Sequence, residues 1–271
     1  MGLFSNNYSK SGTGRRLTGF ARYTELLDRD FKRLFLVNLL TLIGFLPFLL
    51  GMLAAVLTSS LLILLPSCIL GGILAGPSLS CMYDAVFRSL RDAPGKCLEN
   101  YKRALKQNWR QSILPGIVFC LLIGFYVFML MMFWLAPAPP SVGTTALYLF
   151  GIIMFTMFFS VYWPQLVLFR QSIRQTVRNC ILFLVRYFVK TLGCAILSVL
   201  YWGIVVLFLP WSVVLLPLTG FWFIVFTANF LLYSTLDQAF HIEEQITQAF
   251  PEQAAIYEDD EQWLKRKQSE Q

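Results

Sequence analysis

The sequence predicts an all-α membrane protein, a six-helix transmembrane bundle built of three hairpins. The prediction is based on the composition and on the distribution of charged residues along the chain. Of the 271 residues, 57% are hydrophobic and 14% are charged, whereas soluble domains carry about 25% charged residues. Residues 34–83, 111–169 and 191–236 contain no Asp, Glu, Lys, Arg or His. Because one span needs about 20 residues, each of these runs is long enough for two helices. The strands of a closed barrel would alternate apolar and polar residues, and these runs do not.

Breaks inside the three runs set the expected spans. Thr58-Ser59-Ser60 divides the first run, a proline-rich stretch over 136–143 the second and Pro210-Trp211 the third. The expected spans are 34–58, 61–83, 113–136, 146–169, 191–209 and 212–235. The chain then has three parts: a cytoplasmic N-terminal tail with an amphipathic lead-in helix (1–33), a six-span membrane domain (34–236) and a charged cytoplasmic tail (237–271).

The basic residues predict the orientation. Blocks 1–33, 84–110 and 170–190 hold 7, 7 and 5 Lys and Arg residues, while the hairpin tips hold none. The positive-inside rule therefore places these blocks and both termini in the cytoplasm. A basic inner surface is suited to anionic lipid head groups, and the sequence has no recognition fold for nucleic acid. We therefore expect membrane lipids, and no nucleic acid, as partners.

Two basic amphipathic helices are expected on this cytoplasmic side. In 97–110 an apolar stripe recurs at three- and four-residue steps, with basic residues on another side. The stripe is Leu98, Tyr101, Leu105 and Trp109, and the basic residues are Lys102, Arg103, Lys106 and Arg110. The second helix carries Arg170, Arg174 and Arg178 at four-residue spacing, hence on one face. These seven basic residues are the candidate contacts to a protein partner or to anionic lipid.

The lead-in helix before the first span has a similar pattern. Its expected apolar stripe is Phe20, Tyr23, Leu27, Phe31 and Leu34, and its basic residues Arg22, Arg29, Lys32 and Arg33 fall outside that stripe. The pattern predicts an amphipathic helix before the first span.

Proline and glycine residues mark expected kinks and close contacts in the first hairpin. Pro47 and Pro77 lie inside predicted spans, where proline removes an N–H and kinks a helix. Gly72 and Gly76 have the GxxxG spacing of close helix contacts. We interpret these four residues as kink and packing positions, with a substrate site as the alternative. Pro115 is expected in the first turn of the third span, where proline is acceptable.

Residues that could carry chemistry are few. Asp84 precedes Arg88 by one turn, which favours an ion pair over a polar contact to a partner. The polar candidates inside the spans are Asn38, Gln165 and Asn229, which could form hydrogen bonds between helices or a shared solute site. The single histidine, His241, needs no role, and the six cysteines have no CxxC spacing. We therefore expect no enzyme activity, no cofactor and no metal.

Several stretches resemble one family of bacterial membrane proteins. The segment Gly76-Pro77-Ser78-Leu79-Ser80-Cys81-Met82-Tyr83 is followed by the aromatic and basic segment Tyr101 to Gln111. Further matching stretches are the start Met1 to Phe4, Val37 to Leu40 with Leu46-Pro47, and Tyr162 to Asn179. Together these resemble the YesL family. The resemblance implies a bacterial plasma membrane protein with an accessory role in carbohydrate uptake, and it carries over no catalytic residue.

Two functional hypotheses follow. In the first, the chain is an accessory or scaffold protein whose basic cytoplasmic helices bind a transporter, a regulator or anionic lipid. In the second, it is an autonomous transporter or channel for a small solute, with kinked helices that shape a cavity. The absence of charged residues from the spans argues against a proton-coupled pump or a voltage-gated channel.

Overall fold

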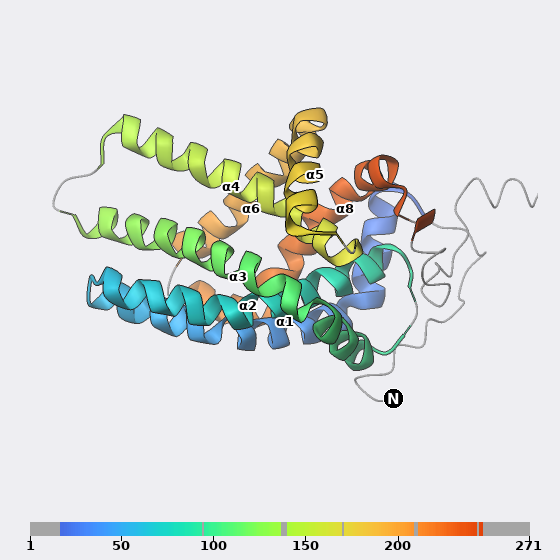
Figure 1. Ribbon diagram of the computed structural model, residues 1–271, viewed down its shortest axis with the longest axis horizontal. Coiled ribbons are helices and arrows are strands. Elements are labelled where there is room, and N and C mark those ends of the chain that lie inside the picture. Colours follow the sequence, from blue (N-terminus) through green and yellow to red (C-terminus); the bar gives the residue numbers. More distant parts are fainter. Residues whose placement is uncertain are drawn as a thin grey trace, which may run out of the picture.

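The computed structural model describes residues 17–93, 95–136, 140–169, 171–208, 211–242 and 244–245. The predicted N-terminal tail up to residue 16, most of the C-terminal tail and the candidate contact Arg170 lie outside these residues. Within the described ranges, all regular secondary structure is helical (Figure 1). The helices are α1 (Gly19–Leu57), α2 (Leu61–Leu90), α3 (Cys97–Leu135), α4 (Val142–Leu168), α5 (Ile173–Arg186), α6 (Phe188–Leu207), the 3-10 helix η1 (Trp211–Val214), α7 (Leu215–Leu218) and α8 (Gly220–Phe240).

The predicted class of all-α protein with membrane-length helices is confirmed. Five helices are long and apolar enough to cross a membrane: α1, α2, α3 up to Phe133, α4 and α6. A sixth candidate is the pair formed by Trp211–Leu218 and Gly220–Phe240, which is bent by 62°. The number of candidate spans is therefore five, or six if the bent pair counts as one.

Two helices are longer than predicted. The lead-in helix and the first span form one helix of 39 residues, and so do the basic helix 97–110 and the third span. At 1.5 Å per residue each is about 58 Å long, whereas a bilayer with its head groups is about 40–45 Å thick. Pro115 thus lies inside α3 and not in a first turn. The helix continues through this position although proline has no N–H to donate to the preceding turn.

The sixth predicted span differs most from its prediction. In place of one helix over 212–235, the chain forms η1 and α7 and then turns into α8. Pro217 lies within α7, and Gly220 begins α8. A proline and a glycine within four residues weaken helix propagation here, which accounts for the break.

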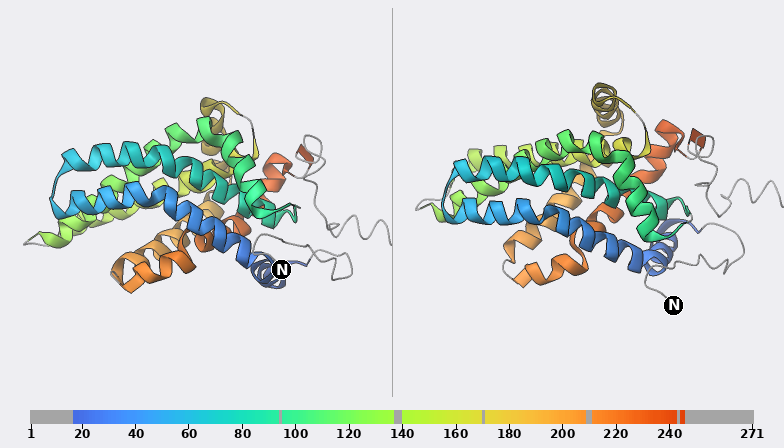
Figure 2. Two further views of the ribbon diagram at one scale, coloured as in Figure 1. Left: turned by 90° about the horizontal axis from the view of Figure 1, so that it is seen from below. Right: turned by 60° about the horizontal axis from the view of Figure 1, so that its bottom comes forward.

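Helices α1, α2 and α3 lie side by side, with α2 in contact with both others (Figure 2). Glycines allow the close approach of α2 and α3. A Cβ atom added at Gly72 would lie 2.5 Å from the Ile117 Cα atom, and one added at Gly76 would lie 2.8 Å from the Gly116 Cα atom. The two glycines singled out in the sequence therefore lie directly against α3.

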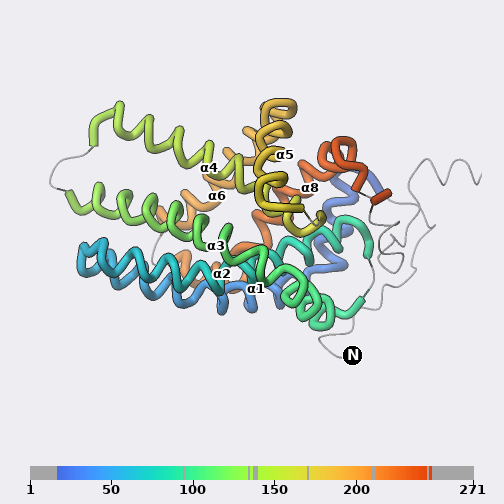
Figure 3. Tube along the Cα trace, in the orientation of Figure 1, coloured from blue at the N-terminus to red at the C-terminus, as the bar shows by residue number. Residues whose placement is uncertain are grey.

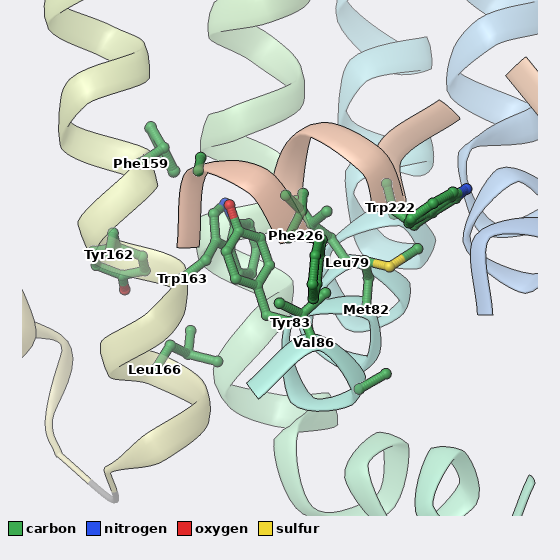
Figure 4. Packing of buried hydrophobic residues seen from close by; sticks show 14 of the residues in the cluster. Leu79, Met82, Tyr83, Val86, Phe159, Tyr162, Trp163, Leu166, Trp222 and Phe226 are labelled. Atoms are coloured by element: carbon green, nitrogen blue, oxygen red, sulfur yellow. The ribbon is translucent and has the colours of Figure 1, made fainter. Parts of the chain in front are cut away.

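Aromatic side chains fill the core between α2, α4 and α8 (Figure 4). Tyr83 of α2 stacks on Trp163 of α4 with 6.2 Å between ring centroids. Phe226 of α8 is fully buried in the same cluster. Tyr83 lies near the end of α2 and Trp163 near the end of α4. We call the end of the bundle at which α1 begins, α2 ends, α3 begins and α8 ends the basic end (Figure 3).

The lead-in part of α1 is covered on both its apolar and its polar side. Phe20 is exposed, while Arg22, Asp30 and Arg33 are buried. Tyr23 of the predicted apolar stripe does pack between Phe226 and Phe230 of α8. The polar side is covered as well because it meets charged groups at the end of α2. Amphipathic periodicity alone does not reveal such a match of charges.

Candidate functional site

A network of buried ion pairs joins α1 to the end of α2. Asp92 accepts hydrogen bonds from the guanidinium groups of Arg22 and Arg29. The carboxylate of Asp92 is fully buried, as is that of Asp30. Asp30 accepts from the Ser89 hydroxyl at 2.5 Å and from Arg29 Nη2 at 2.8 Å. The network clamps the lead-in part of α1 onto α2.

The backbone at the end of α2 places Asp92 for this role. Asp92 has a φ of 57°, in the left-handed region, which aspartate tolerates better than most residues. Its N–H bonds to the Ser89 carbonyl oxygen, and the Ala93 N–H bonds to the Arg88 carbonyl oxygen at 2.9 Å. These bonds satisfy carbonyl groups at the helix end and turn the Asp92 carboxylate toward α1.

Asp84 lies just beyond the uncharged segment of α2, beside this network. Its ion pair with Arg88, predicted from the sequence, is confirmed at 3.0 Å. Burial raises the pKa of the Asp84 carboxyl to about 6. Three nearby guanidinium groups, those of Arg103, Arg33 and Arg91, act in the opposite direction. Arg103 is therefore close enough to Asp84 to act on its charge, whereas Lys102, Lys106 and Arg110 of the same helix are exposed.

The N-terminal part of α3 presents an exposed basic face. Lys102, Lys106 and Arg110 are exposed, and no acidic side chain among the described residues pairs with them. Beside them lie Leu98 and Trp109, which are 37% and 38% exposed. Leu98 and Trp109 belong to the predicted apolar stripe, yet they flank the basic face. The other two residues of the stripe, Tyr101 and Leu105, are half-buried.

Small residues, and not the predicted large ones, make the closest contact of this part of α3 with the bundle. The buried positions are Cys97, Asn100, Ala104 and Ser112. Cys97 Sγ lies 3.9 Å from the Arg33 carbonyl oxygen, and Cys81 Sγ lies 3.7 Å from the Tyr101 carbonyl oxygen. Small side chains let backbones approach closely, so the helix is rotated away from the docking that its large apolar residues predict.

Asn38 of α1 holds the break between α7 and α8. Its Nδ2 group donates to the Leu216 and Pro217 carbonyl oxygens, each at 2.9 Å. Its Oδ1 atom accepts from the Phe221 N–H at 2.9 Å and from the Trp222 N–H at 3.4 Å. One side chain thus satisfies backbone groups on both sides of a helix break, as backbone within an apolar environment requires.

Gly220 is required for this contact. A Cβ atom at position 220 would lie 2.6 Å from Asn38 Oδ1, closer than nonbonded carbon and oxygen atoms approach. The Tyr201 hydroxyl donates to the Gly220 carbonyl oxygen at 2.9 Å from the other side. Asn38 is therefore a structural support of the break, one of the two roles that the sequence left open for it.

The other two polar candidates lie apart from Asn38. Asn229 donates from Nδ2 to the Val225 carbonyl oxygen of its own helix at 2.7 Å, and its side chain lies near the Tyr83 hydroxyl. Gln165 of α4 is fully buried, and neither its amide oxygen nor its amide nitrogen has a hydrogen-bond partner within the described part of the chain. The Trp163 indole N–H is likewise unpartnered there. Such groups are costly in an apolar interior.

Sequence reasoning missed the buried ion pairs. In the sequence, Arg22 falls outside the apolar stripe and no role is predicted for Asp30, Ser89 or Asp92, although Asp30 and Asp92 are the only acidic residues that are fully buried in the described part of the chain. No local pattern marks them, since their partners lie about 60–70 residues away in the sequence. For metals, the described residues contain no group of three His, Cys, Asp or Glu side chains able to hold an ion.

The described residues form a helical protein with five or six segments long and apolar enough to cross a membrane, a buried ionic clamp and an exposed basic face at one end. Comparison with family models, with curated proteins and with solved structures finds no match.

Proposed function

We propose that the chain is a multi-pass accessory or scaffold protein of the bacterial plasma membrane, with both termini and the basic end in the cytoplasm. The observation that carries the proposal is the exposed face of Lys102, Lys106 and Arg110. These residues have no acidic partner within the described residues, and the buried Cys97, Ala104 and Ser112 hold their helix against the bundle. A rigid basic face of this kind suits an acidic patch on a transporter or a regulator.

The proposed orientation is supported by the sequence and agrees with the arrangement of the helices. The segments that hold 7, 7 and 5 basic residues flank the beginning of α1, the α2–α3 connection and α5. The connections at 58–60 and 136–141 hold none. The link to carbohydrate uptake is supported by the resemblance to the YesL family alone.

The test is a binding experiment with a matched pair of variants. Lys102→Gln, Lys106→Gln and Arg110→Gln are combined in one chain, and Lys96→Gln serves as the control at an exposed residue that already pairs with Glu99 at 3.2 Å. The triple variant should keep its thermal stability and lose partners that co-purify from native membranes, while the control retains them. Retention of the same partners at the same salt sensitivity by the triple variant would contradict the proposal.

A second candidate function, transport of a small solute, is favoured by the buried polar groups of Gln165 and Trp163, which have no hydrogen-bond partner among the described residues. Buried donors and acceptors without protein partners are able to hydrogen-bond a polar, uncharged solute. Under this alternative, the purified chain in liposomes shows saturable solute flux that Gln165→Leu abolishes and the triple glutamine variant does not change. Under the accessory function, the purified chain alone moves no solute.

A further inference from the structure

Helix α5 lies across the direction of the spans. The spans run along the long axis of the molecule, whereas α5 is oriented across it (Figure 1), and the views in Figure 2 agree. Its N-terminus is fixed by a capping box, in which Ser172 Oγ accepts from the Gln175 N–H and Gln175 Oε1 accepts from the Ser172 N–H at 3.0 Å. After Tyr187, the chain turns directly into the candidate span α6.

One face of α5 is anchored to the bundle. Thr176, Cys180 and Phe183 are buried. The Phe183 ring stacks on Phe240 at the end of α8 with 5.7 Å between centroids, and it also contacts Tyr187 at 4.8 Å. The orientation of α5 is therefore fixed by contacts to other helices and not by the connection alone.

The opposite face of α5 is exposed and changes from basic to apolar along the helix. Its N-terminal half carries Arg174 and Arg178, which are exposed and have no acidic partner among the described residues. The C-terminal half of the same face carries Ile181, Leu182 and Val185, which are 52%, 59% and 77% exposed. Residues 171–190 contain no acidic residue at all.

This gradient fits a lipid surface better than it fits water or an acidic protein. Exposed isoleucine, leucine and valine are stable against acyl chains, while arginines one turn apart are matched in charge to phosphate groups. The apolar half leads into α6, whose exposed Val189 continues the apolar surface. An acidic protein patch would bind the arginines but would leave the apolar half in water.

We infer that α5 is an interfacial helix whose Arg174 and Arg178 bind the phosphate groups of anionic phospholipids while Ile181, Leu182 and Val185 lie in the acyl-chain region. The inference deepens the proposed function, since it rests on the membrane orientation proposed there. It assigns to α5 a lipid partner, separate from the protein partner proposed for α3.

The depth of α5 can be measured with one introduced cysteine. The six native cysteines are buried, so a maleimide dye labels Val185→Cys selectively in the full-length chain. In liposomes, quenchers attached to acyl chains should quench this dye, and aqueous iodide should not. Quenching by iodide to the same degree in liposomes as for a dye at Lys102→Cys would overturn the inference. Cross-linking between Val185→Cys side chains of two copies would also overturn it, because a second chain would then cover this face.

Lipid selectivity tests the role of the arginines. Energy transfer from the dye to labelled phosphatidylglycerol reports its preference over phosphatidylcholine beside α5. Each arginine should contribute roughly 5-fold to this preference, so Arg174→Gln with Arg178→Gln should reduce it by up to roughly 25-fold and remove its salt dependence. The Arg174→Lys and Arg178→Lys pair should retain most of it, which controls for folding. An unchanged preference in the glutamine pair would refute the lipid assignment.

The variants on α3 keep this test distinct from that of the proposed function. Lys102→Gln with Lys106→Gln should leave the lipid preference at α5 unchanged. Loss of protein partners in the α3 variant together with an unchanged lipid preference in the α5 variant would refute the inference and retain the proposed function. The opposite pair of results would retain the lipid helix and refute the proposed protein partner.

Discussion

Replacement of Asn38 by alanine should destabilise the fold through the break between α7 and α8. The Asn38 side chain makes three hydrogen bonds of 2.9 Å and a longer one of 3.4 Å to backbone groups there. Hydrogen bonds between membrane helices contribute about 0.6 kcal/mol each on average, which gives about 2 kcal/mol for the set. Because these backbone groups are partly or fully buried and would lose their partner, a loss of about 2–4 kcal/mol is expected.

Gly220 allows the same contact to be tested by a double-mutant cycle. Gly220→Ala alone should cost about 1–3 kcal/mol, since its Cβ atom would lie 2.6 Å from Asn38 Oδ1. In the Asn38→Ala background that atom is gone, so the second substitution should cost much less. The two effects should therefore be strongly non-additive.

The assay is reversible unfolding in mixed detergent and dodecyl sulfate micelles, followed by circular dichroism. Thr41→Val serves as the control on α1, because the Thr41 hydroxyl bonds mainly to the Val37 carbonyl oxygen of its own helix at 2.8 Å. It should cost well under the effect of Asn38→Ala. Additive effects of Asn38→Ala and Gly220→Ala, or equal effects of Asn38→Ala and Thr41→Val, would refute the assignment of Asn38 as the support of the break.

Three further predictions concern the packing and the ionic clamp. Asp92→Asn should lower the free energy of unfolding by about 3 kcal/mol, because Arg22 and Arg29 lose a buried partner. Glu99→Gln removes a charge from an exposed pair and should have no measurable effect. Equal melting temperatures of these two variants would contradict the clamp. Gly76→Leu should lower the free energy of unfolding by about 2 kcal/mol or more and reduce the yield of folded protein, since the new side chain would collide with α3. Gly193→Leu should be tolerated, because no atom lies within 4 Å of a Cβ atom added there. The pKa of Asp84 is raised to about 6 in the folded chain, above its value of about 4 in the unfolded chain. Between these two pH values the folded state retains a proton that the unfolded state loses. The contribution of Asp84 to stability should therefore fall as the pH rises from about 4 to about 6. Titrations of the wild type and Asp84→Asn that run parallel over this range would exclude that contribution.

The helical class and the membrane-length segments could be predicted because they depend on composition averaged over many residues. Runs such as 34–83 exclude charge entirely, so no local detail alters the conclusion. The ends of helices were less predictable. At Pro115 the helix continues because the α2 contacts around Gly116 hold it, whereas near Pro217 the chain breaks where Asn38 supplies the backbone partners.

The candidate site was predictable only where its residues act through local spacing. The exposed face of Lys102, Lys106 and Arg110 follows from helical periodicity, and so does the Asp84–Arg88 pair. The burial of Asp30 and Asp92 depends on contacts between α1 and α2 that are remote in sequence. The docking of α3 through Cys97 and Ala104 depends on how closely small residues let two backbones approach, which hydrophobicity does not report.

The most direct test of the account is the side of the membrane on which the basic end lies. Gly143 lies in the first turn of α4 at the opposite end and is exposed, and a Cβ atom added there would lie 3.9 Å from Ser141 Oγ. Lys102 is exposed at the basic end. The native cysteines are buried, so an introduced cysteine is the reactive one. In intact cells, a membrane-impermeant maleimide should label Gly143→Cys at once and Lys102→Cys only after permeabilisation. Labelling of Lys102→Cys in intact cells, with Gly143→Cys protected, would contradict the orientation on which the protein and lipid contacts both depend.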